Sequence, residues 1–257
     1  VFFGTGGRGA EGIYHATFNP ANGRFSPAKL AAKMKGMAND GTVIGMAVTE
    51  TYGYNMVANP KAGFTQADIT PLTTTAGFQM GIVSLASKGW NDFGDVIAAA
   101  KAGETIRFGT MSPRIADIAY LLGEANGVEF NIIEVRGGKA VMNGVNAGDM
   151  DLGFMAGIQA KGVASGELVN LASALSTPLK MSPEAKGMDA YGVDFVLDGY
   201  FMFAGPAGMP SDARKAISNA IAEIVHDPST KAGGFIKKAF GGPATISGSA
   251  LGGLLAK

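Results

Sequence analysis

Apolar runs of strand length alternate with amphipathic stretches of helix length between about residues 39 and 155. Asn39, Asp40 and Gly41 predict a turn, and the apolar run 42–48 that follows predicts a buried strand. Repeated strand–helix–strand spacing predicts parallel sheets with helices on both faces. The expected strands are 42–48, 79–86, 105–109, 130–135 and 151–155, and the expected helices are 91–101, 113–125 and 139–146.

The expected helices carry recognisable residues at their ends. Asn91 is a predicted N-cap, and Gly103 lies just past the end of the same helix. Ser112 is a predicted N-cap before Pro113, whose missing N–H costs nothing at the first helical position. Gly148 closes the third helix. These residues fix where the loops between strands and helices lie.

The last third of the chain adds two expected strands, 168–175 and 199–204, joined by a loop-rich connection. Ser211 is the predicted N-cap of a helix with one apolar stripe, made of Ala216, Ile217, Ala220, Ile221, Ile224 and Val225. Because strands can cross between two βα groups, we expect an α/β chain of two lobes. Residues 106–203 form one lobe, and residues 1–105 with 204–257 form the other.

Residues 1–35 do not follow this alternation and predict a β-meander with a turn. Within them, residues 4–9 satisfy the spacing G-x-G-x-x-G, which would suit a dinucleotide phosphate loop of a nucleotide-dependent enzyme. That motif requires a helix directly after it. The residues that follow look β-like, so we expect a glycine turn between strands.

Composition excludes several classes of protein. The chain has 257 residues, 47% of them hydrophobic and 16% charged, which is enough apolar material for a core. Lys plus Arg and Asp plus Glu are both 21, so no basic excess points to a nucleic-acid partner. Cysteine is absent, which excludes disulfides, thiolate nucleophiles and cysteine-ligated zinc. No apolar run reaches the ~18 residues of a membrane span. The residues after Val1 show no basic stretch followed by an apolar one, so we expect no signal peptide in this sequence. We therefore expect a soluble protein, or the soluble part of one.

The loop after the expected strand 105–109 is a candidate anion site. Ser112 and Pro113 begin a helix whose first N–H groups face the loop with partial positive charge. Arg114 lies in the first turn, where acidic residues are usual. This end suits a carboxylate, although a well-capped helix with a solvated Arg114 is the alternative.

A second such helix start follows at Arg136, Gly137, Gly138 and Lys139. Two glycines allow close approach of the backbone to a ligand, and two cations flank them. The alternative is a tight turn with exposed basic side chains. Both helix starts follow strands of the same predicted parallel sheet, so we expect them at the same edge.

The sequence contains few of the residue patterns that are typical of catalytic sites. The chain has two histidines, and His226 lies at the end of a helix, where its charge complements the helix dipole. There is no G-x-S-x-G, no H-E-x-x-H and no P-loop lysine motif. Asp149 and Asp151 straddle a turn, where acids are common without function. An anion site without bases, nucleophiles or metals indicates a receptor, and we expect no enzyme activity, cofactor or metal.

The order of several short segments resembles the receptors of tripartite tricarboxylate transporters, the Bug-type periplasmic solute-binding proteins. The resemblance covers about residues 37–257. The family's strand pattern P-D-G-Y-T-L, its Y-G-S-S-G loop, its P-Y-K-G-G-A-P-A segment, its G-G-Q-V-D-L segment and its F-A-P-A-G-T-P turn have counterparts here. In that order, the counterparts are residues 39–44, 108–112, 135–140, 148–152 and 203–210. Residues 69–72 give a sixth match.

The resemblance implies a two-lobed periplasmic-binding-protein-like fold with a ligand cleft between the lobes. It implies a periplasmic protein that binds a small carboxylate through backbone amides and passes it to membrane permease subunits, and we expect a monomer. The 108–114 loop lacks the second half of the family's loop, so side-chain specificity is expected to differ. The expected ligand-binding residues are Gly6, Gly7, Thr49, Gly109, Thr110, Met111, Ser112, Arg136, Gly137 and Gly138.

Residues 1–33 resemble instead the first strands of lactonase-type β-propellers, through the segments 3–5, 12–14, 18–23 and 30–32. A lactone-hydrolysing enzyme is therefore the alternative function. It would need further propeller blades of roughly 40–50 residues each, and residues 40–257 show no such repeat. We interpret the segment as a fusion, a mis-assembled sequence or a divergent receptor N-terminus, in which residues 1–3 supply the family's missing first strand.

Overall fold

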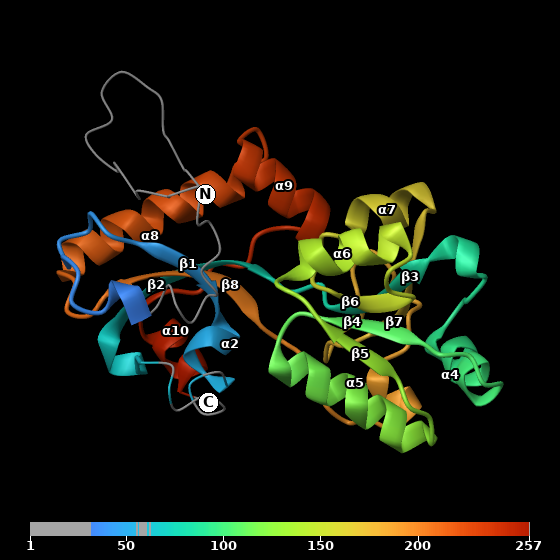
Figure 1. The fold of residues 1–257 in the computed structure, drawn as a ribbon. Helices are drawn as coiled ribbons and strands as arrows, with labels where there is room; N and C mark the ends of the chain where they lie inside the picture. Colours follow the sequence, from blue (N-terminus) through green and yellow to red (C-terminus); the bar gives the residue numbers. More distant parts are fainter. Residues whose placement is uncertain (1–31, 55, 57–60, 62, 257) are drawn as a thin grey trace. The chain divides into compact units, whose positions relative to one another are not determined.

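Two sheets, one of five strands and one of three, organise the chain in a computed structural model that describes residues 32–54, 56, 61 and 63–256 (Figure 1). Unit 1 holds the described residues up to Ala76, Gly199–Thr230 and the described residues from Ala244 onward. Unit 2 holds Gly77–Asp198 and Lys231–Pro243. The fold is therefore α/β with two units, and unit 1 is discontinuous in sequence.

The five-stranded sheet of unit 2 has the order β5-β4-β6-β3-β7. Parallel pairing joins β4 to both β5 and β6, whereas β3 runs antiparallel to both β6 and β7. The expected parallel arrangement is thus correct for three adjacent strands and wrong for β3. The bounds are β3 Gly81–Leu85, β4 Arg107–Thr110, β5 Asn131–Glu134, β6 Leu152–Met155 and β7 Leu168–Ser173.

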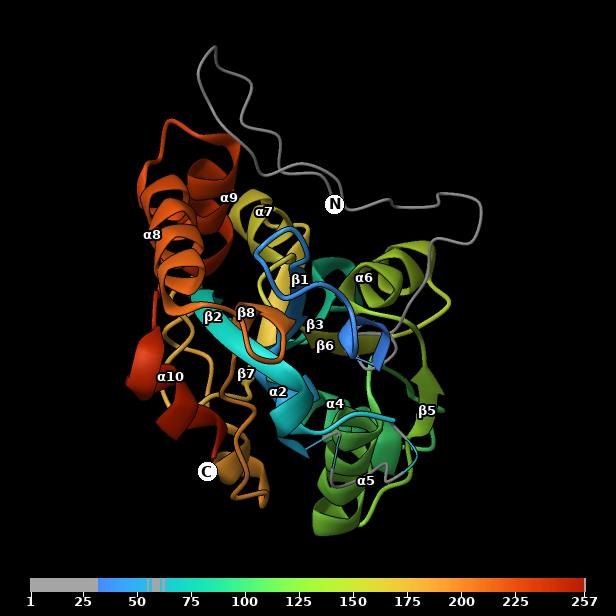
Figure 2. The ribbon, with the colours of Figure 1, turned by 90° about the vertical axis from the view of Figure 1, so that its left-hand side faces the viewer.

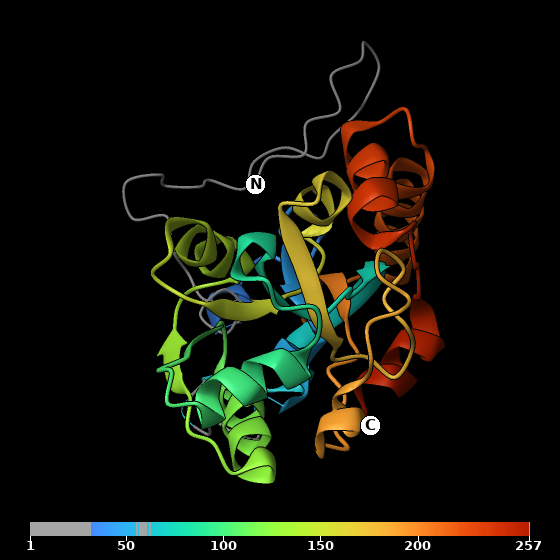
Figure 3. The same cartoon turned by 90° about the vertical axis from the view of Figure 1, so that its right-hand side faces the viewer.

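Helices cover both faces of this sheet, as expected, with α6 and α7 on one face and α4 and α5 on the other (Figures 1 and 3). Beneath α4 and α5 lies an aromatic core in which Phe108 stacks on Phe154 at 5.1 Å between ring centroids. Phe93 and Phe130 pack against Phe108. The bounds are α4 Phe93–Lys101, α5 Pro113–Asn126, α6 Gly138–Ala147, α7 Ala160–Ser165 and α9 Lys231–Phe240, with the 3-10 helices η3 Ala86–Lys88 and η4 Met188–Tyr191.

Unit 1 contains the three-stranded sheet β1-β8-β2, with α8 on one face and α2 and α10 on the other (Figures 1 and 2). Its core joins Tyr52 of α2, Met202 of β8 and Leu251 of α10. The bounds are β1 Gly45–Val48, α2 Thr49–Tyr52, η2 Gln66–Asp68, β2 Ile69–Gly77, β8 Tyr200–Pro206, α8 Ser211–His226 and α10 Gly248–Leu255.

Buried threonines of β2 bind the returning segments of unit 1. The Thr74 hydroxyl donates to Ala244 O at 2.6 Å and accepts from Ile246 N at 2.7 Å. The Thr70 hydroxyl donates to Pro206 O at 2.8 Å. Because these backbone groups are distant in sequence, the threonines hold the separate pieces of unit 1 together.

The unit bounds differ from those expected at residues 105–106 and 203–204. Residues 77–105 belong to unit 2 because β3 lies inside the five-stranded sheet and Phe93 of α4 joins its aromatic core. Residues 231–243 also belong to unit 2, where Phe240 of α9 packs on Gly157.

Two expected N-caps are displaced by one residue. Asp92, not Asn91, caps α4, because its carboxylate accepts from Gly94 N at 2.7 Å. Pro210 precedes α8, so Ser211 is the first residue of that helix.

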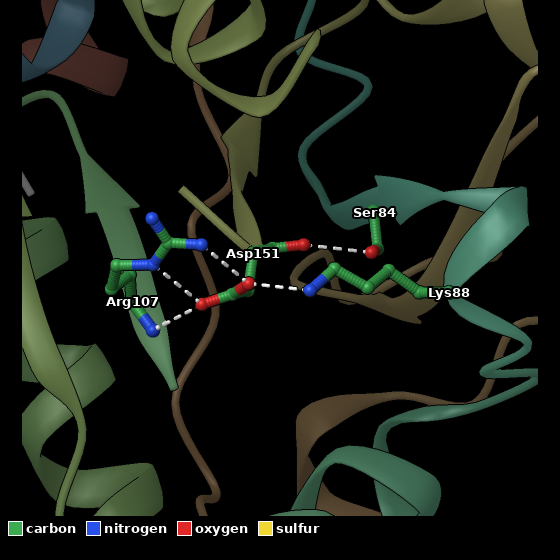
Figure 4. Close-up of polar contacts among 4 residues, drawn as sticks. All are labelled: Ser84, Lys88, Arg107 and Asp151. Atoms are coloured by element: carbon green, nitrogen blue, oxygen red, sulfur yellow. Dashed lines mark hydrogen bonds and ion pairs between the residues drawn. The ribbon is translucent and has the colours of Figure 1, made fainter. Parts of the chain in front are cut away.

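An ion cluster joins three strands of unit 2 at the edge where β4 and β6 begin (Figure 4). The Asp151 carboxylate accepts from Arg107 Nε at 3.0 Å, from Arg107 N at 2.9 Å and from Lys88 Nζ at 2.6 Å. Ser84 of β3 donates to Asp151 O at 2.7 Å. Burial of the Asp151 carboxyl opposes its ionisation, but the hydrogen bonds from Arg107 and Lys88 outweigh burial and hold its pKa well below the ordinary range. The buried carboxylate is therefore charged and fully paired.

Replacing Asp151 with Asn is expected to lower the free energy of unfolding by about 2 kcal/mol at pH 7, the range of a hydrogen bond to a charged group. Since the folded-state pKa is lowered, this stabilisation is complete above the ordinary Asp pKa of about 3.9 and is lost as the pH falls below it. Urea unfolding at pH 7 and pH 3 measures both effects. Asp92→Asn is the control, because its partner Lys186 is exposed and Asn also caps helices. Equal losses in the two variants would contradict the assignment.

Replacing Thr74 with Val is expected to destabilise unit 1 by about 2 kcal/mol, because Ile246 N–H and Ala244 C=O lose their partner in a buried site. Thr73→Val is the matched control, since among the described residues the Thr73 hydroxyl bonds only to the adjacent Thr74 O, at 3.0 Å. Denaturant unfolding compares the two variants. A loss in Thr73→Val as large as that in Thr74→Val would show that the cross-segment bonds are not the cause.

Candidate functional site

Three parallel strands of unit 2, β5, β4 and β6, end at the same edge of the sheet. Each is followed by a short loop and a helix: residues 111–112 lead to α5, 135–137 lead to α6, and 156–159 lead to α7. Because the strands are neighbours, these loops lie side by side at the carboxyl ends of the strands, where open α/β sheets bind ligands. The Asp151 cluster lies at the opposite edge.

The start of α5 carries its own cap and no acidic residue in its first turn. Ser112 accepts from Ile115 N at 3.4 Å, as expected for an N-cap, and Pro113 is the first helical residue. The remaining N–H groups of the first turn have no partner inside the helix. Their partial positive charge is not offset by a carboxylate in that turn.

Arg114, in the first turn of α5, contacts another segment of unit 2. Its Nη2 donates to Val196 O at 3.1 Å, and its guanidinium lies 5.1 Å from the Phe195 ring centroid. The connection between β7 and β8 therefore holds this side chain, which explains why an arginine is tolerated in the first turn.

The start of α6 is open. Gly137 precedes the helix with φ 78° and ψ 158°, a backbone region that only glycine adopts readily. It supplies no side-chain cap, and the first turn contains no acidic residue. Arg136 and Lys139 beside it are both exposed. The sequence therefore builds an uncapped helix N-terminus between two cations.

The contrast with α4 of the same unit is informative. There Asp92 caps the helix and Asp95 lies in the first turn, so α4 carries two carboxylates of its own at its positive end. The helices α5 and α6 carry none in their first turns. An anion from outside the chain is what these two adjacent helix ends would stabilise.

Apolar side chains from the flanking loops meet at the start of α6. A Cβ added at Gly138 would lie 3.7 Å from Met111 Sδ and 3.7 Å from Ile158 Cγ2. The loops that carry Met111 and Ile158 therefore both lie close to the start of α6. Met111, Gly137 and Gly138 are brought together at this edge, with Ser112 beside Met111 in sequence.

Gly109 and Thr110 are placed differently from the other expected residues. Gly109 lies beneath α6, where an added Cβ would meet Met150 Sδ and would lie 3.1 Å from Val141 Cγ1, so its role in the structure is packing. Thr110, the last residue of β4, is fully buried, and its hydroxyl has no hydrogen-bond partner among the described residues. It lies one residue before Met111.

Thr49 belongs to unit 1, where its hydroxyl accepts from Tyr200 N at 3.1 Å at the start of β8. It begins α2, a helix of only four residues. Gly6 and Gly7 lie outside the described residues, as do the G-x-G-x-x-G spacing and nearly all of the lactonase-like segment.

A buried amide network positions the third loop, and sequence reasoning missed it. Gln159, fully buried, accepts from Gly157 N at 2.7 Å and donates to Gln79 O at 2.9 Å. Gln79 in turn accepts from Lys180 N at 2.7 Å, and Asn170 donates to Ser182 at 2.9 Å. The partners are far apart along the chain, so no local pattern could reveal them.

Within the described residues, no cluster of three or more His, Asp or Glu could hold a metal ion. No described helix is long and apolar enough to cross a bilayer.

No protein-family model and no curated protein matches the chain. Solved structures do. A TctC solute-binding protein from Polaromonas is 20% identical with a TM-score of 0.61, covering 88% of this chain and 77% of its own. MatC from Rhodopseudomonas palustris with bound malate is 12% identical with a TM-score of 0.72, covering 88% and 80%. A further R. palustris protein, with adipate, is 16% identical with a TM-score of 0.74, covering 89% and 78%.

At these identities the similarity establishes the fold, not the ligand. The resemblance found in residues 37–257 agrees with the division of the chain into two units and with its α/β sheets. It also agrees with the 88–89% of this chain that the similar structures cover. The chain has the two-lobed α/β fold of the TctC-type periplasmic solute-binding proteins.

Proposed function

We propose that this chain is a periplasmic solute-binding receptor that captures a small carboxylate and delivers it to a tripartite tricarboxylate-type membrane transporter. The observation that carries the proposal is the pair of adjacent helix starts, α5 and α6, with no acidic residue in either first turn and with Arg136 and Lys139 exposed beside α6. The protein is proposed to act as a monomer, without a cofactor.

Main-chain groups dominate the proposed binding. Helix ends contribute ~0.3–1 kcal/mol each when exposed and up to ~2 kcal/mol when partly buried. Charge-assisted hydrogen bonds contribute roughly 1.5–3 kcal/mol each. A few of each, less the ordering cost, agree with a micromolar complex of about −8 kcal/mol. Because the net charge is zero, capture depends on this local field.

The similar structures support the carboxylate as the ligand class. MatC is solved with malate, and the other R. palustris protein with adipate. Both ligands are dicarboxylates, and both proteins share the fold of this chain. We extend the ligand class, but not the individual acids, to this protein.

The alternative, a lactone-hydrolysing enzyme, has no support in the described residues. These residues form a three-stranded sheet and a five-stranded sheet that contains parallel strands, with helices on both faces. A propeller is built from four-stranded blades around a channel. We therefore propose a binding protein, not an enzyme.

The ligand is expected to be an anion. A dicarboxylate such as adipate should bind at least ~100-fold more tightly than its neutral diamide, about 2.8 kcal/mol. Isothermal titration of the matched pair measures the ratio. Equal affinities would mean that the site recognises shape and apolar surface, and that the helix starts of α5 and α6 do not bind the ligand.

Gly137→Val is expected to lower carboxylate affinity at least ~10-fold, because valine cannot adopt the glycine-only conformation and the N–H groups of α6 would be displaced. Gly148→Val is the control: Gly148 also has a positive φ but lies at the other end of α6, with nothing within 4 Å of an added Cβ. It should destabilise the protein and leave the affinity unchanged.

Ser112→Ala should cost about 1 kcal/mol of stability through the lost cap, with a smaller effect on affinity. Titration with adipate ranks the three variants. Parent-like binding in Gly137→Val together with abolished binding in Ser112→Ala would show that the start of α5, not that of α6, is the main anion site.

A further inference from the structure

The direction in which a Cβ atom added at Gly138 would point shows which side chains lie beside the N-terminus of α6. In a helix both the N–H groups and the Cα–Cβ bonds tilt toward the N-terminus. The atoms nearest to an added Cβ at Gly138 therefore flank the space that a bound carboxylate would enter. Those atoms are Ile158 Cγ2 at 3.7 Å, Met111 Sδ at 3.7 Å and Met111 Cε at 4.0 Å.

Both side chains are held in place by packing. Met111 and Ile158 are each partly buried and contact a core cluster beneath α6. The cluster contains Val83, Val141, Val145, Met150, Met155 and Leu168. The main chain of the Ile158 loop is fixed as well, because Gln159 bonds to Gly157 N and to Gln79 O. The apolar atoms thus form a wall attached to the core.

The three loops offer few polar side chains beside this wall. Within residues 111–112, 135–138 and 156–159, all of them described, the polar side chains are those of Ser112, Arg136 and Gln159. Ser112 caps α5, and the amide of Gln159 is fully buried in its own network. Arg136, the third, is exposed. A hydroxyl on the carbon next to the carboxylate would therefore face mainly a thioether, which is only a weak acceptor, and a methyl group.

We propose that Met111, with Ile158, determines the specificity of this site: the receptor selects carboxylates whose neighbouring carbon bears hydrogen or alkyl groups and discriminates against 2-hydroxy acids. The inference rests on the proposed function and deepens it by naming the substrate class. An alkyl substituent gains contact with the wall, whereas a hydroxyl loses its water there without a matched partner. An apolar site of this kind distinguishes a methyl from a hydroxyl by roughly 10- to 100-fold.

The test uses two acids that differ in one group, 2-methylsuccinate and malate, titrated calorimetrically into the full chain. The parent protein is expected to bind 2-methylsuccinate at least ~10-fold more tightly than malate. Met111→Ser places a hydroxyl at the wall and should reduce this ratio at least ~10-fold. Ile158→Thr, which changes the volume little, should shift the ratio in the same direction and serves if Met111→Ser does not fold.

Leu85→Ser is the matched control. Leu85 is partly buried against the same core cluster but ends β3 at the opposite edge of the sheet, so this variant should lose stability without changing the ratio. An unchanged ratio in both Met111→Ser and Ile158→Thr, or equal binding of the two acids by the parent, overturns this inference and leaves the proposed function standing. Absence of binding for both acids overturns this inference, whereas the proposed function is tested separately by the titration of adipate and its diamide.

Discussion

The close approach of α6 to its sheet is the constraint on which the candidate site depends. Val141 lies over Gly109 of β4 and Gly153 of β6, and a Cβ at either glycine would collide with the helix or with Met150. Gly144 allows the same closeness from the helix side, where an added Cβ would be 2.9 Å from Met150 Sδ. Because the side chains between α6 and the sheet are so closely packed, the helix can lie in only one position against the sheet. The direction of its first N–H groups follows from that position.

The two ends of the strands in the five-stranded sheet differ in the charged groups that they carry. At the edge where β4 and β6 begin, Asp151 pairs with two cations, Arg107 and Lys88, and ties β4, β6 and the end of β3 together. At the opposite edge, the first turns of α5 and α6 hold no acidic residue, and Arg136 and Lys139 are exposed beside α6. The paired edge stabilises the unit, and the other edge carries the proposed binding site.

Much of the fold followed from local patterns, and the exceptions have physical causes. The cap at Ser112, the glycine at Gly148 and the strand–helix alternation placed β4 to β6 and α5 to α6 within a few residues. β2 was not expected, because its threonines look polar and become buried only by bonding to segments at 206 and 244–246.

The antiparallel direction of β3 likewise depends on distant partners that no local window contains. At the candidate site, the starts of α5 and α6 lie at the same edge of the sheet, as expected, and Met111 lies close to Gly138. Gly109, however, is a packing position, and Arg114 contacts the connection between β7 and β8. The contact with Ile158 and the amide of Gln159 could not be found from spacing, since they arise from the packing of three loops.

The position of β3 in its sheet has a consequence for how this chain folds. β3 is the first strand of unit 2 in sequence, yet its partners are β6 and β7, so that Gly81 pairs with Met155 and Ser173. One of its hydrogen-bonding sides stays open until the chain has been made as far as β6, and the other until it has been made as far as β7. Such distant pairing requires long loops to close first, which slows folding and prolongs exposure of an apolar strand. During synthesis, the segment GIVSL of β3 is therefore an apolar strand that stays unpaired for a long stretch of the chain and is prone to aggregation.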